Sequence, residues 1–474
     1  MKITLDNIKA DLIPENEQER TVCNSIANAH AVMAPGALYM RAYQVWKKTK
    51  GKAGWDGRVR LIQKSVMTGI VPYVIDKLKG QVSRIEVVDN RTSISKVLSN
   101  TSVPLKDYQK EAVDAAINNK ENGLWWPRGI LEIATGGGKT EVAVAMYQIM
   151  PVPTLFLVHR KHLLKQAKDR FLKYGIQSGQ VGDGVLDLHP NLNIATIQTI
   201  ESKLRRGESM GWLNDVQQVF FDEAHSIAAS VAKGNSFVNV SNMLPNAYFR
   251  WGLTATPFMK DEYSNWLLMG ATGKSLYSIS NATLIEKGHL TPPEIIMVEA
   301  PKVTCPNSWP DCYNSGIVLN TGRTQLIIDW IKKIDKPCLI LCTQIAHAEI
   351  ISYNASLQGI HVPVLKGGDS SETRANVIKD LREGRLDQVV CTSIFNEGVD
   401  IPELRGLILA AGGKSKVSQL QKLGRGLRRA EKKDRVVVVD FSDTSSKILI
   451  RHSKERKKIW EEQGFEIKLN ANLK

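Results

Sequence analysis

The sequence predicts an α/β protein with two tandem parallel-sheet lobes and a small N-terminal α+β domain. Short apolar runs alternate with helical patterns across most of the chain, which is typical of parallel sheets. Three adjacent glycines separate one strand-like run from one helix-like run. The length of 474 residues suits about three domains. We expect boundaries at 1–100, 101–290 and 291–474, with a basic helix ending the last.

The composition is that of a soluble globular protein, with 43% apolar and 23% charged residues. The start lacks a signal-peptide core, and no run approaches the roughly 18 apolar residues of a membrane span. We therefore expect a cytoplasmic protein, in the host cytoplasm if it is of phage origin. The six cysteines show no CxxC pair and no zinc spacing, and those in apolar runs are predicted to be buried structural thiols: Cys338, Cys342 and Cys391.

The net charge of +15 and the pI near 9.4 indicate a polyanionic partner, either nucleic acid or an anionic membrane. Residues 1–100 hold 16 Lys and Arg against 9 Asp and Glu, and residues 412–474 hold 17 against 8. Because the excess lies at both ends of the chain, we expect the partner to contact both.

The stretch "LEIATGGGKTEVAVAMYQIM" has the pattern of a phosphate-binding turn between a strand and a helix. Glycines let backbone N–H groups point at an anion, Lys139 reaches the β- and γ-phosphates, and Thr140 offers a hydroxyl to Mg²⁺. Ile133 stands where the strict pattern has a glycine, which keeps a purely structural turn as the alternative. The predicted cradle consists of Gly136, Gly137, Gly138, Lys139 and Thr140.

A second apolar run, "VQQVFFDEAH", ends in two acids. Asp222 is placed to hold Mg²⁺, and Glu223 to orient or deprotonate the attacking water. An acid pair after a strand is common by chance. Its value comes from following the glycine-rich turn by about one α/β half-domain.

Five segments in sequence now resemble motifs I, II, III, V and VI of superfamily 2 helicases and translocases. They are ATGGGKT, DEAH, GLTATP, CTSIFNEGVDIP and QLQKLGRGLRR. LKDYQKEA, LVHRKHLLKQ, ATIQTI and ILCTQIAHAE resemble further motifs of these proteins. The resemblance covers about residues 105–440 and implies two RecA-like lobes that use ATP and Mg²⁺.

The resemblance also assigns residues to the nucleotide. It places Gln109 at the adenine and Gly398 and Asp400 of motif V in the nucleotide site. Motif VI has the form QxxGRxxR, in which Arg425 and Arg428 share one helix face and act as arginine fingers that make hydrolysis depend on lobe closure. The alternative is an arginine-rich helix that faces solvent or nucleic acid.

Strand contacts are expected at hydroxyl, amide and basic groups of the motifs outside the ATP site. We predict these contacts at Arg160, Lys161, Thr196, Gln198, Lys366, Gly367 and Thr392. Each could instead be a solvated loop residue. The segment "LIEKGHLTPPEIIMVEAP" has a glycine and two adjacent prolines and is interpreted as the connection between the lobes.

The N-terminal segment 50–80 resembles the small domain of phage UvsW-type branch-migration helicases. Basic residues flank an aromatic there, and we predict nucleic-acid contacts at Trp55, Arg58 and Arg60, although Trp55 could instead be packed. Of the tryptophans in "LWWPRGIL", either Trp125 or Trp126 could cover the adenine, but packing beneath the lobe is favoured.

We expect an ATP-dependent superfamily 2 DNA helicase or translocase that unwinds or branch-migrates branched DNA in recombination, repair or replication. The resemblance implies 3′ to 5′ travel, and we expect a monomer that binds DNA and no membrane. The alternatives are an RNA helicase, the motor subunit of a restriction system, and a nucleic-acid-binding scaffold with a dead ATP site. No nuclease constellation of the PD…(D/E)xK type stands out in the sequence. The basic C-terminal segment "RHSKERKKIWEEQGF" fits a helix that either lines the nucleic-acid path or is solvated.

Overall fold

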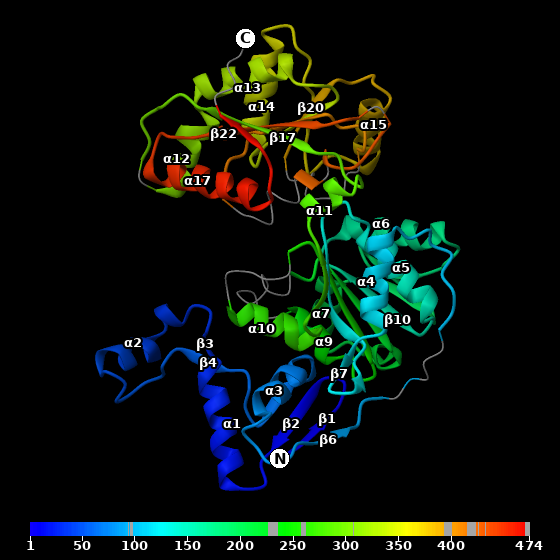
Figure 1. Ribbon diagram of the computed structural model, residues 1–474. Coiled ribbons are helices and arrows are strands. Elements are labelled where there is room, and N and C mark those ends of the chain that lie inside the picture. Colours follow the sequence, from blue (N-terminus) through cyan, green and yellow to red (C-terminus); the bar gives the residue numbers. More distant parts are fainter. Residues whose placement is uncertain are drawn as a thin grey trace. The chain divides into compact units, whose positions relative to one another are not determined.

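The computed structural model describes most of the chain and divides it into two compact units (Figure 1). The described residues are 1–92, 94, 98–225, 236–256, 262–306, 308–392, 401–414, 423–424, 426–431 and 433–469. The first unit comprises Met1–Ile133 and Gly138–Ser278, and the second comprises Ala134–Gly137 and Ile279–Lys474. In the described part of the chain, no helix is long and apolar enough to cross a lipid bilayer.

An eight-stranded, mostly parallel sheet forms the centre of the first unit. Its strands are β9 (Arg128–Ile133), β10 (Thr154–Val158), β11 (Gly179–Gly182), β12 (Val185–Asp187), β13 (Leu192–Thr196), β14 (Gln218–Asp222), β15 (Phe249–Thr254) and β16 (Ser275–Ile279). They lie in the order β12-β11-β13-β10-β14-β15-β9-β16. The central strands are buried along nearly their whole length, as parallel strands covered on both faces should be.

Helices cover both faces of this sheet (Figure 1). One face carries α4 (Asp107–Ile117), α5 (Lys139–Ile149) and α6 (Lys161–Lys173). The other carries α7 (Ile197–Arg205), α9 (Ser236–Asn242) and α10 (Glu262–Ala271). The predicted strand and helix on either side of the three glycines are thus confirmed as β9 and α5.

The N-terminal part forms its own four-stranded sheet. Its strands are β1 (Lys2–Leu5), β2 (Lys9–Ile13), β5 (Ser65–Met67) and β6 (Glu86–Asp89), in the order β5-β2-β1-β6. Alternate residues of β1 and β2 are buried, so one face of this sheet packs on a core. Helices α1 (Glu17–Ala29) and α3 (Val71–Leu78) contact each other beside it. The predicted α+β character of this region is confirmed.

The N-terminal part and the first large sheet share one core. Trp126 and Trp266 are 3% and 7% exposed and pack with apolar residues of the N-terminal sheet. The buried guanidinium of Arg128 donates from Nη2 to the Asn7 carbonyl at 3.1 Å, and Asn7 Nδ2 donates to the Pro245 carbonyl at 3.0 Å. These contacts fix the N-terminal sheet to the large sheet and explain why both belong to one unit.

A segment of the N-terminal part projects from this core, and we call residues 31–60 the arm (Figure 1). It contains β3 (Ala31–Met33), the 3₁₀ turn η1 (Ala37–Tyr39), α2 (Arg41–Lys48) and β4 (Arg58–Arg60). Strands β3 and β4 pair antiparallel at its base, and β3 also contacts α10.

The second unit is built on a seven-stranded parallel sheet. Its strands are β17 (Pro293–Glu299), β18 (Cys338–Leu341), β19 (Val364–Leu365), β20 (Gln388–Cys391), β21 (Gly406–Leu409), β22 (Val436–Ser442) and β23 (Ile467–Leu469), in the order β19-β20-β18-β21-β22-β17-β23. Helices α13 (Thr321–Lys333) and α14 (Ile345–Ser356) lie on one face, and α12 (Trp309–Tyr313) and α17 (Lys447–Glu462) on the other (Figure 1). Helix α11 (Asn281–Glu286) precedes the sheet, and α15 (Ser371–Arg382) follows β19.

Two details of the second unit bear on the sequence analysis. The interpretation of "PPEIIMVE" as a connection is wrong, because Pro293–Glu299 forms β17 between β22 and β23. Its apolar run is buried in the sheet, and Pro293 stands at the first position, where a strand tolerates proline. The cysteines predicted to be buried thiols, Cys338, Cys342 and Cys391, are buried, and none of the three forms a disulfide bond.

Candidate functional site

The phosphate loop has the geometry that its glycines require. Gly136 and Gly138 have φ of +86° and +81°, in the left-handed region where glycine is unstrained. Gly138 is also the N-cap of α5, so the free N–H groups of that helix and its partial positive charge face the loop. Lys139 and Thr140 occupy the first turn of α5. The loop therefore presents backbone donors, a lysine and a hydroxyl at one helix end, which suits a phosphate.

Gln109 lies against this loop. It is 5% exposed on α4, and its Oε1 accepts the Lys106 backbone N–H at 2.9 Å. A Cβ placed on Gly138 would lie only 2.3 Å from Gln109 Nε2. Gly138 is thus required both by its backbone angle and by the neighbouring amide. The adenine contact that we expect of Gln109 stays a prediction.

The acid pair follows β14 on the same sheet. Glu223 Oε1 lies 3.5 Å from Lys139 Nζ, and its Oε2 lies 3.3 Å from His225 Nδ1. Glu223 has φ of +49°, a left-handed conformation that is uncommon for a residue with a side chain. Strained backbone concentrates at functional sites, where surrounding contacts hold it.

Sequence reasoning quoted the motifs here but missed the contact that joins them. His225 Nδ1 is 3.0 Å from Thr254 Oγ1, which also accepts the Thr256 N–H at 3.2 Å. A polar chain therefore runs from Lys139 through Glu223 and His225 to the end of β15. DEAH begins at the end of β14 and TATP at the end of β15, and these two strands are neighbours in the sheet. Strand order cannot be deduced from one sequence, so this contact could not be predicted.

The two carboxyl groups of the acid pair, Asp222 and Glu223, have pKa values shifted in opposite directions. Burial, reinforced by the negative charge of Glu223, raises the pKa of Asp222 to about 7. Burial would also raise the pKa of Glu223, but Lys139, His225 and His159 together hold it below the usual value. Burial lowers the pKa of His159 to about 4. Glu223 is thus the charged member and Asp222 the one that burial disfavours as an anion.

The residues present fit a divalent cation. Two neighbouring carboxyl groups are costly to keep ionised together without positive charge nearby. Glu223 Oε2 is buried and makes no hydrogen bond with a described residue. A magnesium ion held by Asp222 and the Thr140 hydroxyl would supply the missing positive charge.

The predicted strand contacts of the first unit gather at one edge of its sheet. Thr196 ends β13 and pairs with Val158 at the end of β10, next to Arg160 and Lys161 at the start of α6. Gln198 is exposed, and its Nε2 donates to a backbone carbonyl following β10 at 2.9 Å. Thr196 itself is 3% exposed, and its hydroxyl bonds to a neighbouring threonine at 2.7 Å. The two basic residues and Gln198 are therefore better placed than Thr196 to contact a ligand through side chains.

The predicted contacts of the second unit meet in the same way. The Thr392 N–H donates to the carbonyl of Leu365 at 3.3 Å, so the ends of β19 and β20 lie together. Lys366 and Gly367 follow directly, and Lys366 Nζ pairs with Glu349 at 2.6 Å. Gly367 is exposed, whereas Thr392 is 6% exposed.

Most of motif V and part of motif VI lie outside the described residues, including Gly398, Asp400 and Arg425. Arg428 is described and is partly buried in the second unit. The backbone of Arg428 pairs with that of Leu290 in an isolated antiparallel β-bridge. A Cβ added to Gly136 would lie 3.6 Å from Arg428 Cγ. Residues 134–137 belong to this unit, so Arg428 lies beside the first half of the phosphate loop.

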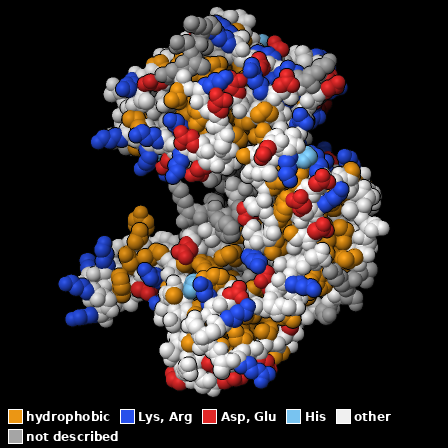
Figure 2. Space-filling view, viewed as in Figure 1, with side chains coloured by type: hydrophobic (Ala, Val, Ile, Leu, Met, Phe, Trp, Pro, Cys, Tyr) orange, Lys and Arg blue, Asp and Glu red, His pale blue; other side chains and the backbone are white. Residues whose placement is uncertain are grey.

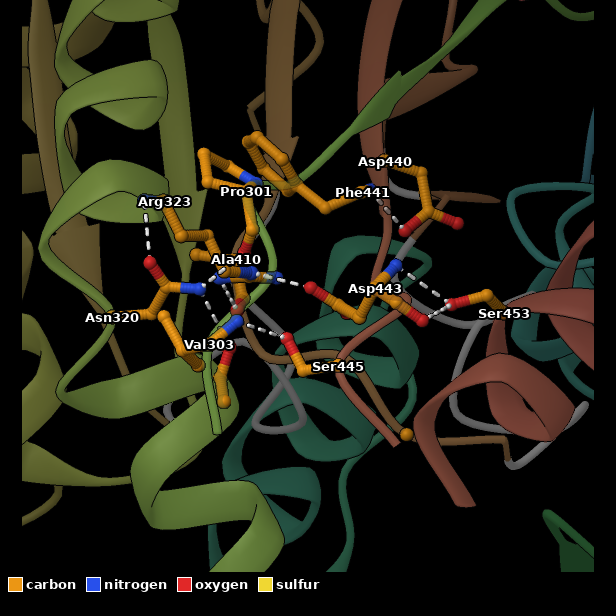
Figure 3. Close-up of polar contacts among 12 residues, drawn as sticks. Pro301, Val303, Asn320, Arg323, Ala410, Asp440, Phe441, Asp443, Ser445 and Ser453 are labelled. Atoms are coloured by element: carbon orange, nitrogen blue, oxygen red, sulfur yellow. Dashed lines mark hydrogen bonds and ion pairs between the residues drawn. The ribbon is translucent and has the colours of Figure 1, made fainter. Parts of the chain in front are cut away.

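A buried charge network holds the loop before motif VI (Figure 3). Arg323 donates from Nε to Asp443 at 2.7 Å and from Nη1 to the Ala410 carbonyl at 2.8 Å. Arg456 of α17 donates from Nε to both oxygens of Asp440 at 3.0 Å and from Nη1 to the Gly413 carbonyl at 2.8 Å. Two arginines thus fix both ends of the 410–413 turn. Sequence reasoning missed them because an arginine in a helix normally faces solvent.

The N-terminal and tryptophan predictions have mixed outcomes. Trp55 is partly buried and donates its Nε1–H to the Arg58 carbonyl at 2.9 Å. Arg58 is exposed, whereas Arg60 pairs with Asp56 at 3.0 Å. Trp126 lies in the shared core, as the favoured packing interpretation expects. Trp125, likewise, donates to the carbonyl of Ile117 at 2.8 Å and packs on two aromatic rings.

Comparison with known proteins matches both units to helicase families. The family described as "Type III restriction enzyme, res subunit" matches residues 102–259, and "Helicase conserved C-terminal domain" matches residues 322–430. The chain is 27% identical over 413 residues to the DNA 3′-5′ translocase XPB2 of Sulfurisphaera tokodaii, covering 78% of this chain and 89% of the relative. It is 24% identical over 430 residues to the ATP-dependent DNA helicase uvsW of Enterobacteria phage T4, covering 82% of each.

Two further comparisons agree. Putative helicase 22 of a Sulfolobus islandicus filamentous virus is 27% identical over 341 residues, which span 66% of this chain and only 60% of the relative. The solved structure of Saccharomyces cerevisiae Dbp5 bound to RNA and ADP BeF3 has a TM-score of 0.56 at 15% identity, covering 77% of this chain and 89% of that one. That likeness shows the fold of two RecA-like lobes alone. With both helicase domains present in order, the chain is a superfamily 2 helicase, a nucleic-acid-dependent ATPase that resembles the UvsW-type members of that superfamily.

Proposed function

We propose that the chain uses ATP to unwind or branch-migrate branched DNA in recombination, repair or replication, travelling 3′ to 5′. The carrying observation is that the basic N-terminal part is built into the same unit as the large sheet and Lys139 of α5, through the core around Trp126 and Trp266. A basic part fixed to the ATPase sheet suits a motor that must hold duplex arms while it moves. The match to a DNA translocase and to uvsW over most of the chain supports DNA as the track.

The residues of the phosphate loop and acid pair take the following roles. Lys139 binds the β- and γ-phosphates, and Thr140 and Asp222 hold Mg²⁺, which neutralises phosphate charge. Glu223 orients the attacking water and accepts its proton, because Lys139 and His225 keep it ionised. Arg428, with Arg425, stabilises the charge that develops on the γ-phosphate.

The polar chain from Glu223 to Thr254 is placed to couple ATP hydrolysis to movement along the DNA. β15 lies next to β14, and β14 lies next to β10, whose end carries Arg160. A change at Glu223 on hydrolysis therefore alters a path of polar contacts that ends on the neighbouring strand. We propose that this path reports nucleotide state to the DNA-contacting edge.

The experiment that tests the proposal is steady-state ATP hydrolysis with four candidate tracks. Four-way DNA junctions, linear duplex, single-stranded DNA and duplex RNA are compared at matched salt, because phosphate binding depends steeply on salt. Lys139→Ala is the control and should abolish the signal. We expect junction DNA to stimulate most. Strongest stimulation by RNA would instead assign the protein to RNA remodelling, and no turnover with any track would assign a scaffold.

The restriction-motor alternative is tested in the same samples. The family match to a restriction subunit raises it, but the match covers the first motor domain only. A motor of that kind translocates on linear duplex without preferring junctions. Equal stimulation by duplex and junction DNA would therefore favour it over branch migration.

A further inference from the structure

The arm, residues 31–60, combines positive charge with exposed apolar side chains. Its sequence holds seven cations and a single acid, Asp56. Asp56 is occupied by Arg60. The other cations are exposed, and no described residue forms an ion pair with them; they are Arg41, Lys47, Lys48, Lys50, Lys52 and Arg58.

Large apolar side chains are exposed on the same arm. Tyr39 is 91% exposed, the highest value among the exposed large hydrophobic residues of the described chain. Leu38 and Met40 beside it are 53% and 45% exposed, and Val45 of α2 is 37% exposed. Figure 2 shows these orange side chains beside the blue cations on the projection. Helix α2 has no buried residue, so this surface is not explained by packing within the chain.

The arm nevertheless has a defined and tightly packed conformation. Gly54 and Gly57 have φ of +92° and +75°, and a Cβ on either would collide with α2. On Gly54 it would lie 2.5 Å from the Ala42 carbonyl oxygen, and on Gly57 2.8 Å from the Tyr43 ring. The loop after α2 therefore lies tightly on the inner face of the helix. The outer face, with its cations and the adjacent Tyr39, is held toward solvent.

We propose that the arm binds the branch point of the nucleic acid, with Tyr39 stacked on the exposed terminal base pair and the six cations on flanking phosphates. A flat ring on an exposed turn suits the open π-face that a branch leaves on its last base pair. Phosphates attract the surrounding cations, and no nearby carboxylate competes with them. The inference rests on the proposed function, because a branched track offers such a face away from the ends of the DNA.

Tyr39 adds a residue to those predicted from the sequence. The contact predicted at Trp55 stays a prediction, and the Trp55 Nε1–H donates to a backbone carbonyl within the arm. Tyr39 had no signal in the sequence, because it lies in an uncharged stretch and its exposure depends on the turn η1. A membrane surface would also suit a basic, apolar helix, but α2 has only eight residues and the chain is a helicase. Nucleic acid is therefore the better occupant.

The test measures binding without requiring ATP turnover. A DNA fork carries 2-aminopurine in the base pair next to the branch, and binding is followed by anisotropy and by the emission of that base. Tyr39→Ala should weaken fork binding about tenfold and lose the emission change, since stacking on an aromatic ring contributes about that factor per base. Tyr39→Phe should keep both. Tyr353→Ala, at a 64% exposed tyrosine of α14, is the matched control and should change neither.

A second variant tests the cations. Replacing Lys47 and Lys48 together by Ala should reduce the slope of log affinity against log salt by about 2, because each phosphate contact contributes about 0.9. Point variants are preferred to deletion of the N-terminal part, since deletion would expose the shared core around Trp126 and Trp266.

The outcomes separate this inference from the proposed function. Stimulation of ATPase by forks with unchanged binding and emission in Tyr39→Ala would overturn the role of the arm and leave the motor assignment intact. If Tyr39→Ala weakened the binding of forked RNA but not of forked DNA, the role of the arm would stand and DNA would be overturned as the track. Binding to phosphatidylserine vesicles that depends on Tyr39, with fork binding unaffected, would overturn the inference in favour of a membrane.

Discussion

Each unit contains a buried charge cluster, and the two clusters differ in how their polar atoms are satisfied. In the first unit, Lys139 faces two acids, and the outer oxygen of Glu223 makes no hydrogen bond with a described residue. Glu223 also has a left-handed backbone, and burial raises the pKa of Asp222 to about 7. This cluster is unbalanced in charge and in hydrogen bonding.

In the second unit, two arginines meet two aspartates, and Figure 3 shows the pair of Arg323 and Asp443. Arg456 donates to both Asp440 oxygens and to two backbone carbonyls, and Arg323 donates to Asp443 and to a third carbonyl. Only Arg323 Nη2 and Asp443 Oδ2 lack a hydrogen bond with described residues, and the latter lies 3.6 Å from Arg456 Nη2. The positive and negative charges balance.

The difference separates a site from a scaffold. Buried polar groups are costly unless they are partnered, so a protein retains an unpartnered set only where a ligand completes it. The first cluster lacks positive charge and hydrogen-bond donors, which Mg²⁺ and water would supply. The second is balanced in charge and fixes the turn at 410–413. Substitutions should therefore impair activity in the first cluster and stability in the second.

The largest effect is expected at Glu223. Glu223→Gln keeps the size of the side chain but removes the proton acceptor, so kcat for ATP should fall about 10³- to 10⁴-fold while nucleotide affinity is retained. The melting temperature should change little, because Gln keeps the size and shape of the side chain. Steady-state hydrolysis, binding of a fluorescent ATP analogue and thermal melting measure the three quantities. The control is Glu299→Gln, at an exposed acid of β17. Hydrolysis at the wild-type rate would show that Glu223 does not act on water.

The next effect is expected at Arg428. Arg428→Ala should lower kcat about 10³-fold with little change in nucleotide affinity, since an arginine finger acts in the transition state. Its neighbour Arg429 is exposed, and Arg429→Ala serves as the matched control. A loss of DNA affinity with normal kcat at saturating DNA would make Arg428 a strand contact instead.

Sequence reasoning reached the first cluster far better than the second. The phosphate loop, the acid pair and the strands on either side follow local patterns, because glycine geometry and apolar runs act over a few residues. The polar chain through His225 and Thr254 depends on two strands lying side by side, and the network of Arg323 and Arg456 joins residues more than 100 positions apart. Such contacts leave no pattern in one sequence.

The error at β17 and the omission of Tyr39 have related causes. Two prolines before an apolar run suggest a connection, but a proline at the first position of a strand costs no ladder hydrogen bond. Exposure of Tyr39 depends on how η1 and α2 fold back on the arm, whereas local sequence describes only an apolar stretch. In both cases long-range packing decides, and local propensity does not.

The third effect tests the scaffold. Arg456→Ala removes the partner of two buried aspartates, and unfolding free energy should fall by about 3–5 kcal/mol. Lys454→Ala, on the exposed face of the same helix, should change stability by less than about 0.5 kcal/mol. Urea unfolding measures both. Wild-type stability in Arg456→Ala would mean that the network carries no net energy, and the comparison between the clusters would fail.

The smallest effect sharpens the comparison, because His347 is unpartnered yet sits in the second unit. It is 0% exposed, and neither ring nitrogen makes a hydrogen bond with a described residue. Burial, with a contribution from Arg323, lowers its pKa to about 3. Because the folded pKa lies below the unfolded value of about 6.5, its contribution to stability is present at neutral pH and is lost as the pH falls below 6.5.

Wild-type protein should therefore lose about 2 kcal/mol more than His347→Leu between pH 7 and pH 5, since about 1.36 kcal/mol is lost per pH unit below 6.5. Urea unfolding at the two pH values measures this, with His361→Leu, at an exposed histidine, as control. Parallel pH profiles for wild type and His347→Leu would refute the assignment. A buried histidine is neutral at neutral pH, so its lack of hydrogen bonds does not leave a buried charge. Glu223 stays charged beside Lys139, so its buried oxygen without a hydrogen bond marks a ligand site, whereas the neutral ring of His347 belongs to ordinary packing.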